Sequence, residues 1–359
     1  MKTHFKGLDS LRAIAAIAVV IGHIELLKPR SSSQSFLAHL PDGHLGVILF
    51  FVISGFLISY LLFEEKKEFG TIHLKQFFMR RILRIWPLYY LTLLLSWLFF
   101  SGTYTGLSTF FTLTIFPNIA HAMGEAWPNS PQVWSIGVEE QFYLVWPFII
   151  LYMRKKWIPV LLLFFVLLYD LGPHILGYLK LHLQGNDSYY IIIQKFIYDS
   201  KFSAIALGAL IGYLVSSKHR ILTILHHPII GFLSILIPFL LWGLNIHWGY
   251  FTDEIFMVLF AFLVLTIATN QNLKLPKELP ILRFLGRISY GIYMFHWMVI
   301  LLANRIFKID FDASDGTYNF LFYLFVFGGT ILIAWISHIT FERFFIQKKV
   351  HFRPSKLTP

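Results

Sequence analysis

Residues 8–27 read LDSLRAIAAIAVVIGHIELL, a stretch that is long and apolar enough to cross a membrane as a helix. Arg12 and His23 lie eleven residues apart within it, so on a 3.6-residue helix they share one face and are separated by roughly 16 Å along the axis. Asp9 falls near the same stripe. Ionisable side chains at membrane depth are costly and rarely lie there without a partner or a task. This polar stripe therefore indicates a functional site.

The composition of the chain indicates an all-α integral membrane protein. Of its 359 residues, 57 % are hydrophobic and only 14 % are charged, whereas a soluble domain is about a quarter charged. The apolar residues form long blocks, and a membrane β-barrel would instead show short alternating segments. The first block carries Arg12 and has no small-residue cleavage site after it, so we expect a retained span. The chain has no cysteine, which excludes thiolate nucleophiles and disulfides.

Ten apolar segments are expected to be transmembrane helices, namely 8–27, 44–63, 83–100, 138–153, 157–171, 197–216, 228–244, 250–269, 284–303 and 317–337. The apolar stretch 107–120 is too short to span and is expected to be interfacial or re-entrant. If the N-terminus is cytoplasmic, most of the 30 lysines and arginines fall in cytoplasmic segments. The positive-inside rule thus predicts about ten transmembrane helices with both termini cytoplasmic.

The same rule explains the net charge of +11 by topology rather than by nucleic-acid binding. We expect a single transmembrane domain over residues 1–359, with no C-terminal extracytoplasmic domain. The basic tail after residue 338 is interpreted as a membrane-surface segment.

His23 is the first candidate catalytic residue, and Arg12 lies on the same stripe. A neutral imidazole in the outer half of the helix can take a proton from a substrate hydroxyl, but a hydrogen-bonded structural histidine is an equal alternative. Glu139 and Glu140 begin the fourth span at about the depth of His23. We expect one of these carboxylates to hold the second imidazole nitrogen, and the other to favour the helix N-terminus.

Arg80, Arg81 and Arg84 lie at the cytoplasmic end of the third span, and they are candidates for phosphate binding. Guanidinium groups fork onto phosphates. The alternative is that these charges only fix the topology and contact anionic lipids.

Two further segments carry candidate substrate-binding residues. Trp134 and Ser135 precede the two glutamates, while Tyr293 and His296 share a polar helix stripe with Ser289. This stripe either lines a cavity or forms hydrogen bonds between helices. Glycines between residues 46 and 57 are typical of close helix packing, and Ser54 has no base beside it in the sequence. The histidines show no metal-binding pattern, so no metal site is expected.

Taken together, these segments resemble the bacterial membrane-bound acyltransferase family 3, the O-acetyltransferases of cell-surface polysaccharides. The spacing of Arg12 and His23 matches the first motif, and Phe-Phe-x-Ile-Ser-Gly-Phe matches at 50–56. Arg-x-x-Arg matches at Arg81 and Arg84, and Trp-Ser-x-x-x-Glu-x-Gln-Phe-Tyr matches at 134–143. Any one match is weak, but all of them in order are specific.

The resemblance implies a ten-span enzyme in the bacterial cytoplasmic (inner) membrane. It moves an acyl group, commonly acetyl, from cytoplasmic acyl-CoA to a hydroxyl of an extracytoplasmic or lipid-linked glycan. Acetyl-CoA is then a co-substrate, and no permanently bound cofactor is expected. His23 is the implied catalytic residue, as base or as acyl carrier, while Arg81 and Arg84 contact the CoA end.

The expected partners are acyl-CoA, a glycan or glycolipid acceptor and membrane lipid, without nucleic acid. The resemblance leaves open whether the chain delivers the acyl group alone or through a separate extracytoplasmic transferase. The main alternative is a transporter or flippase of glycolipid or acyl donor, which is typically built from inverted repeats with broken helices. Neither feature is clear in the sequence.

Overall fold

The computed structural model describes residues 5–27, 42–183, 187–273, 278–307 and 316–354, and within these ranges all regular structure is helical. Six helices are long and apolar enough to cross a membrane, and a bent helix pair adds a seventh. The chain therefore has the helices of a multi-pass membrane protein. The six are α1 (Leu8–Leu27), α2 (Gly43–Phe69), α3 (Leu74–Phe99), α7 (Ile158–Leu183) with the turn before it, α12 (Thr252–Thr269) with the turn before it, and α15 (Gly316–Ser337) with the short helices that follow it.

Three more of the predicted spans are helices that are shorter or less apolar: α6 (Trp134–Tyr152), α9 (Phe202–Ser216) and α11 (Pro228–Gly243). The predicted interfacial stretch 107–120 forms two short helices, α4 (Gly106–Leu113) and α5 (Pro117–Ala122). Ile115 lies between them with a φ of 67°, a left-handed conformation that no helix can continue.

Two predicted spans are broken rather than continuous. The predicted helix 197–216 is divided at Lys201, which has a φ of 45°, so that α8 (Asp187–Ser200) ends and α9 begins there. The predicted helix 284–303 is divided at Ile288 into α13 (Pro280–Arg287) and α14 (Ser289–Ile306), which meet at an angle of 72°.

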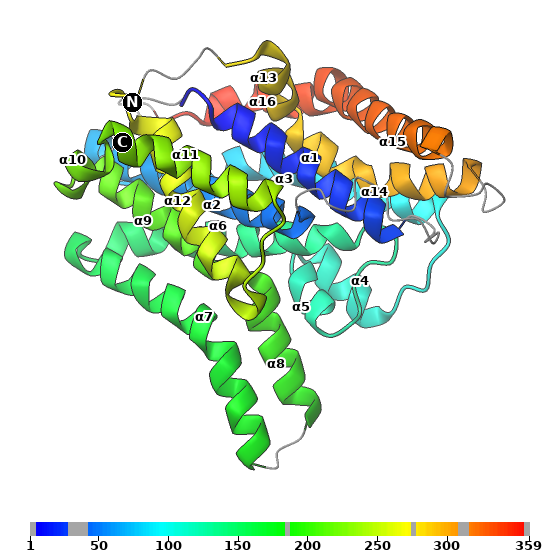
Figure 1. The fold of residues 1–359 in the computed structure, drawn as a ribbon, viewed down its shortest axis with the longest axis horizontal. Coiled ribbons are helices and arrows are strands. Elements are labelled where there is room, and N and C mark those ends of the chain that lie inside the picture. Colours follow the sequence, from blue (N-terminus) through cyan, green and yellow to red (C-terminus); the bar gives the residue numbers. More distant parts are fainter. Residues whose placement is uncertain (1–4, 28–41, 184–186, 274–277, 308–315, 355–359) are drawn as a thin grey trace.

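Short α10 (Ile221–Leu225) precedes α11. The helices α7 and α8 extend as a pair away from the other helices (Figure 1).

α2 lies at the centre of the packing, against α1 and α9, and its glycines allow the close contact. A Cβ atom on Gly55 would lie 2.0 Å from the carbonyl oxygen of Ile205, and one on Gly46 would lie 2.6 Å from that of Ala15. In α9, a Cβ on Gly208 would lie 2.2 Å from the oxygen of Val52. This confirms the interpretation of the glycines between residues 46 and 57 as packing residues.

Contacts between helix ends define two ends of the bundle. At the end that we call the basic end, Ser10 Oγ donates to Glu278 (2.7 Å) and Lys66 Nζ to the carbonyl oxygen of Ile150 (2.7 Å). At the opposite end, the amide of Asn304 donates to the carbonyl oxygen of Leu27 (3.3 Å). Phe5, just before α1, contacts Tyr60 in the second half of α2 (ring centroids 5.0 Å apart). A Cβ on Gly22, near the end of α1, would lie 2.9 Å from the Cα of Gly43 at the start of α2, so these two helices run in opposite directions.

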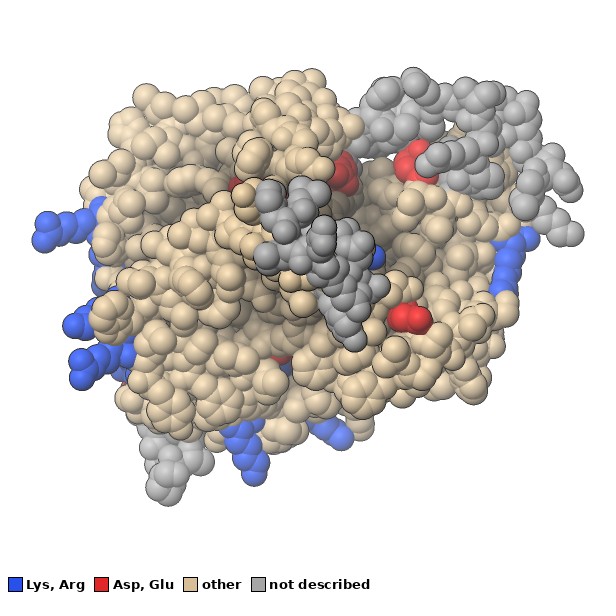
Figure 2. Space-filling model, turned by 90° about the horizontal axis from the view of Figure 1, so that it is seen from below, with Lys and Arg blue, Asp and Glu red and all other residues tan. Residues whose placement is uncertain are grey.

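The C-terminal segment returns to the basic end. α15 continues through a π-helical turn (His338–Glu342) into α16 (Arg343–Lys348) and a 3₁₀ turn, η6 (Lys349–Phe352). Arg80 Nη1, near the start of α3, donates to the carbonyl oxygen of Phe352 (2.7 Å), which places η6 beside the start of α3. Lys and Arg side chains project mainly at the left and lower edges of the face in Figure 2, which is otherwise mostly uncharged.

Candidate active site

A cavity of about 290 Å³ lies between α1, α2, α3, α6 and α14. Both Val47 and Leu61 of α2 line it, and at 1.5 Å per residue these two positions are about 21 Å apart along the helix. The cavity is therefore long and narrow. Six of the residues predicted from the sequence line it, namely Arg12, Arg81, Arg84, Ser135, Glu139 and Tyr293.

The charged groups of this cavity are mostly cationic. Three cations from α3 and η6 line it, Arg81, Arg84 and Lys349, and none of them has an ion-pair partner among the residues that the structure describes. The buried Nε of Arg81 has no hydrogen-bond partner there either. Because an unpaired charge away from water is costly, such a group of cations is suited to bind an anion.

Arg12 and Glu139 lie deeper in the cavity, and both have partners. Arg12 Nη1 lies 3.5 Å from Asp9 Oδ1, one turn earlier on α1. Glu139 Oε2 accepts a hydrogen bond from Tyr143 OH (3.0 Å), which is itself hydrogen-bonded to Ser54 Oγ. Ser54 thus joins a hydroxyl network that ends on a carboxylate.

Arg80 does not join Arg81 and Arg84 in the cavity. Its Nη2 lies 3.0 Å from Glu65 Oε2, and its Nη1 donates to the carbonyl oxygen of Phe352 at 2.7 Å. The side chain is held in an ion pair and fixes the C-terminal segment. Of the three arginines that the sequence predicts to bind phosphate, Arg81 and Arg84 line the cavity and Arg80 does not.

His23 contacts a second histidine rather than a carboxylate. Its Nδ1 lies 2.7 Å from Nε2 of His296, and the two rings are nearly parallel, with 8° between their planes. His296 is fully buried, and its Nδ1 lies 2.6 Å from the carbonyl oxygen of Tyr293. The sequence analysis placed Glu139 or Glu140 at the second nitrogen of His23, and the structure corrects this: His296 takes that position.

This chain of contacts determines where the protons lie when both rings are neutral. A carbonyl oxygen only accepts, so Nδ1 of His296 carries the proton and Nε2 of His296 is an acceptor. Nδ1 of His23 must then carry its proton and donate it to His296. Nε2 of His23 is left with a free lone pair, which is the form that a general base requires.

Tyr293 connects the histidine pair with the cavity. Its side chain lines the cavity, and its hydroxyl lies 2.7 Å from Ser135 Oγ and 2.9 Å from the carbonyl oxygen of Gln132. Its backbone carbonyl holds His296. His23 and His296 themselves do not line the cavity in this structure. Tyr293 therefore lies between the cavity and the histidine pair.

Glu140 and Trp134 lie outside the cavity. Glu140 Oε2 accepts from Trp86 Nε1 at 2.8 Å, which ties α6 to α3. Trp134 stacks on His121, with ring centroids 5.6 Å apart. The predicted catalytic role of Glu140 and the predicted substrate contact of Trp134 gain no support from their positions.

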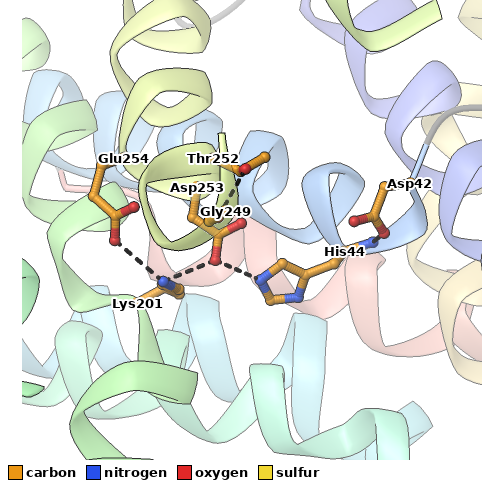
Figure 3. A network of polar contacts seen from close by, with 7 residues as sticks. All are labelled: Asp42, His44, Lys201, Gly249, Thr252, Asp253 and Glu254. Carbon is orange, nitrogen blue, oxygen red and sulfur yellow. Dashed lines mark hydrogen bonds and ion pairs between the residues drawn. The ribbon is translucent and has the colours of Figure 1, made fainter. Parts of the chain in front are cut away.

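A second polar cluster lies at the opposite end of the bundle (Figure 3). Asp253 Oδ2 lies 2.8 Å from Lys201 Nζ and 3.1 Å from His44 Nε2, and Lys201 also contacts Glu254 at 3.5 Å. Asp42 begins α2 by accepting from the backbone N–H of His44 (2.9 Å). The cluster joins α2, α9 and α12 where Lys201 interrupts the helix, so its charges are paired within the fold.

Residues 5–339 match the family described as an acyltransferase domain. The chain belongs to this family. It is 27 % identical to "O-acetyltransferase OatA" of Staphylococcus aureus (strain NCTC 8325 / PS 47) over 328 residues, 84 % of this chain and 51 % of that protein. It is 26 % identical to "Putative O-acetyltransferase SACOL0978" of Staphylococcus aureus (strain COL) over 387 residues, 98 % of this chain and 59 % of that protein. The chain thus spans between half and three fifths of the length of these relatives. No solved structure matches it.

Sequence reasoning missed several residues of this acyltransferase domain. Lys349 was assigned to a surface tail, and nothing local distinguishes it from the lysine before it. Tyr143 is detectable in principle, because it lies one helical turn after Glu139 and so shares its face. The pairing of His23 with His296 joins residues that are 273 positions apart, and no local pattern carries that information.

Proposed function

We propose that the chain is a membrane O-acyltransferase that moves an acetyl group from cytoplasmic acetyl-CoA to a hydroxyl of an extracytoplasmic or lipid-linked glycan. The observation that carries the proposal is the cavity that begins among unpaired cations and ends at Tyr293, beside the His23–His296 pair. Membership of the acyltransferase family and similarity to proteins named O-acetyltransferases support it.

The proposed topology has about ten transmembrane helices in a bacterial cytoplasmic membrane, with both termini on the cytoplasmic side. The alternation of helix ends supports this arrangement. The start of α1, at Ser10, contacts Glu278, and Arg80 near the start of α3 contacts Phe352 in the C-terminal segment. The basic end would face the cytoplasm, as the positive-inside rule requires.

In this scheme acetyl-CoA enters from the basic end. Arg81 and Arg84 bind its phosphates, since guanidinium groups suit phosphate oxygens. The volume of about 290 Å³ lies at the lower end of the range for small-molecule sites, which suits the narrow pantetheine arm better than the nucleotide. The nucleotide would remain at the cationic mouth while the arm passes Arg12 toward Tyr293.

The chemistry follows from the free lone pair of His23. Nε2 takes the proton of the acceptor hydroxyl as its oxygen attacks the thioester carbonyl. The tetrahedral intermediate collapses, the C–S bond breaks, and the CoA thiolate leaves with the proton that His23 had taken. His296 stabilises the charged imidazole through its Nε2. In the two-step variant, Nε2 of His23 itself attacks the thioester carbonyl, the C–S bond breaks and CoA leaves as the thiolate. The acceptor hydroxyl then attacks the acetyl-imidazole, His23 is released, and the hydroxyl proton goes to the CoA thiolate.

The proposal is tested with membranes that contain the protein and acetyl-CoA labelled in the acetyl group. We expect base-labile label in the glycan or lipid-linked glycan fraction, and a loss of about 10²–10⁴-fold in the rate for His23→Ala. The matched control is His247→Gln, because His247 is exposed, is hydrogen-bonded to Asn245 and does not line the cavity. Transfer by His23→Ala at the wild-type rate would remove His23 from the mechanism, and the absence of any transfer by wild type would reject the function.

A further inference from the structure

Lys349, the third cation of the cavity, lies outside the sequence motifs that the chain shares with the acyltransferase family. Lys349 belongs to η6, more than 260 residues after Arg84 along the chain, yet both line the same cavity. Since no described carboxylate pairs with Lys349, its charge is not needed to neutralise a charge of the protein. The charge is therefore available to an anionic ligand.

The position of Lys349 is fixed by its neighbours in the C-terminal segment. Three residues later, the carbonyl oxygen of Phe352 accepts the hydrogen bond from Arg80 (2.7 Å). Arg80 is held in turn by Glu65, which is 3 % exposed and also accepts from the backbone N–H of His73 (2.9 Å). η6 is thus anchored to α2 and α3, and Lys349 is built into the wall of the cavity rather than left on a loose tail.

The adjacent lysine shows that this placement is specific. Lys348 Nζ lies over the ring of Phe344, 4.0 Å from its centroid, one turn earlier on α16. Lys348 does not line the cavity, whereas Lys349 does. The two lysines are adjacent and carry the same charge, but Lys348 is exposed and Lys349 is partly buried in the cavity wall, so Lys348 is a control for the loss of a nearby charge.

We propose that Lys349 is a donor-binding residue and that it completes, with Arg81 and Arg84, a three-cation site for the phosphates of acyl-CoA. This inference rests on the proposed function and extends it to the C-terminal segment, which becomes one wall of the donor site. The class of ligand is a phosphorylated nucleotide thioester. A lysine ammonium binds such a phosphate as a point charge beside the forked contacts of the two arginines.

The test compares donors with and without phosphate on purified protein in detergent. Binding of acetyl-CoA and of S-acetylpantetheine, which lacks the nucleotide and its phosphates, is measured for wild type, Lys349→Gln, Lys349→Arg and the control Lys348→Gln. We expect Lys349→Gln to weaken acetyl-CoA binding about 10-fold or more, as is typical when a charged hydrogen-bond partner is lost. Binding of S-acetylpantetheine should not change, Lys349→Arg should restore most of the affinity, and Lys348→Gln should bind like wild type.

The outcomes separate this inference from the function on which it rests. If wild type does not bind acetyl-CoA, the proposed function fails. If wild type binds acetyl-CoA and Lys349→Gln binds it equally well, the function stands and the role of Lys349 is rejected. Equal losses for acetyl-CoA and S-acetylpantetheine, or a failure of Lys349→Arg to restore binding, would show that Lys349 acts on the fold, which also rejects the inference.

Discussion

At the scale of single residues, the structure shows what sets the tautomer of His23, and in the proposed function this prepares the ring to act as a base. The backbone carbonyl of Tyr293 sets the proton position on His296, and His296 sets it on His23. The neutral ring of His296 and the carbonyl of Tyr293 together correspond to the aspartate of a serine–histidine–aspartate triad, which fixes the tautomer and the orientation of the histidine. The sequence identified His23 because of its depth, but the partner comes from a helix near the other end of the chain.

This arrangement makes His296 a positioning residue with a testable effect. We expect His296→Phe to lower the rate of acetyl transfer about 10²-fold or more, because His23 then loses the acceptor that fixes its tautomer. The affinity for acetyl-CoA should remain within about a factor of two of the wild-type affinity, because the cations proposed to bind acetyl-CoA lie elsewhere. Rate and affinity are measured separately, by single-turnover transfer and by direct binding.

His296→Gln serves as the conservative comparison, because its amide oxygen can still accept from His23. It should retain more activity than His296→Phe. If both variants transfer acetyl at the wild-type rate, the contact between His23 and His296 has no role in catalysis.

At the scale of helices, close packing follows from the sequence while helix breaks do not. Gly46 and Gly55 lie in an apolar helix, where small residues typically allow neighbouring backbones to approach, and the structure confirms this with the oxygens of Ala15 and Ile205. The break at Lys201 was missed because the polar residues Asp199, Ser200 and Lys201 were taken as part of one apolar segment, 197–216. It forms because Lys201 contacts Asp253 and Glu254 of α12, and these contacts are invisible in the local pattern.

The packing of α9 on α2 predicts a strong effect at Gly208. A valine there would drive its Cβ to within 2.2 Å of the carbonyl oxygen of Val52, so we expect Gly208→Val to destabilise the protein by about 3 kcal/mol or more. The control is Gly328→Val on α15, where nothing lies within 4 Å of the added Cβ. Thermal unfolding in detergent measures both. Equal melting temperatures for Gly208→Val and wild type would contradict the described α2–α9 contact.

At the scale of the whole molecule, the sequence predicted an all-helical membrane protein, and it placed Arg81 and Arg84 together but missed Lys349. Hydropathy and loop charge are summed over many residues, so a wrong assignment of one residue changes the predicted spans and topology little. The exact spans are less predictable: third-span helix α3 begins at Leu74 rather than near residue 83, and α7 extends to Leu183. The cavity itself required the structure, because five helices and η6 contribute to its walls.

In the proposed function, the donor enters at the basic end and reacts near the opposite end. The chain has no cysteine, so single cysteines at exposed Ser101 and Gln271 report the orientation of the protein in vesicles through labelling by an impermeant maleimide. In our account, Ser101→Cys marks the extracytoplasmic side and Gln271→Cys the cytoplasmic side.

The side of donor entry is tested with vesicles in which the protein has one known orientation. Acetyl-CoA is supplied to one face of the membrane at a time, and the release of CoA is measured. We predict release when acetyl-CoA is on the face where Gln271→Cys is labelled, and none above background when it is on the face where Ser101→Cys is labelled. Release only from the Ser101 face, or equal release from both faces of intact vesicles, would contradict the account.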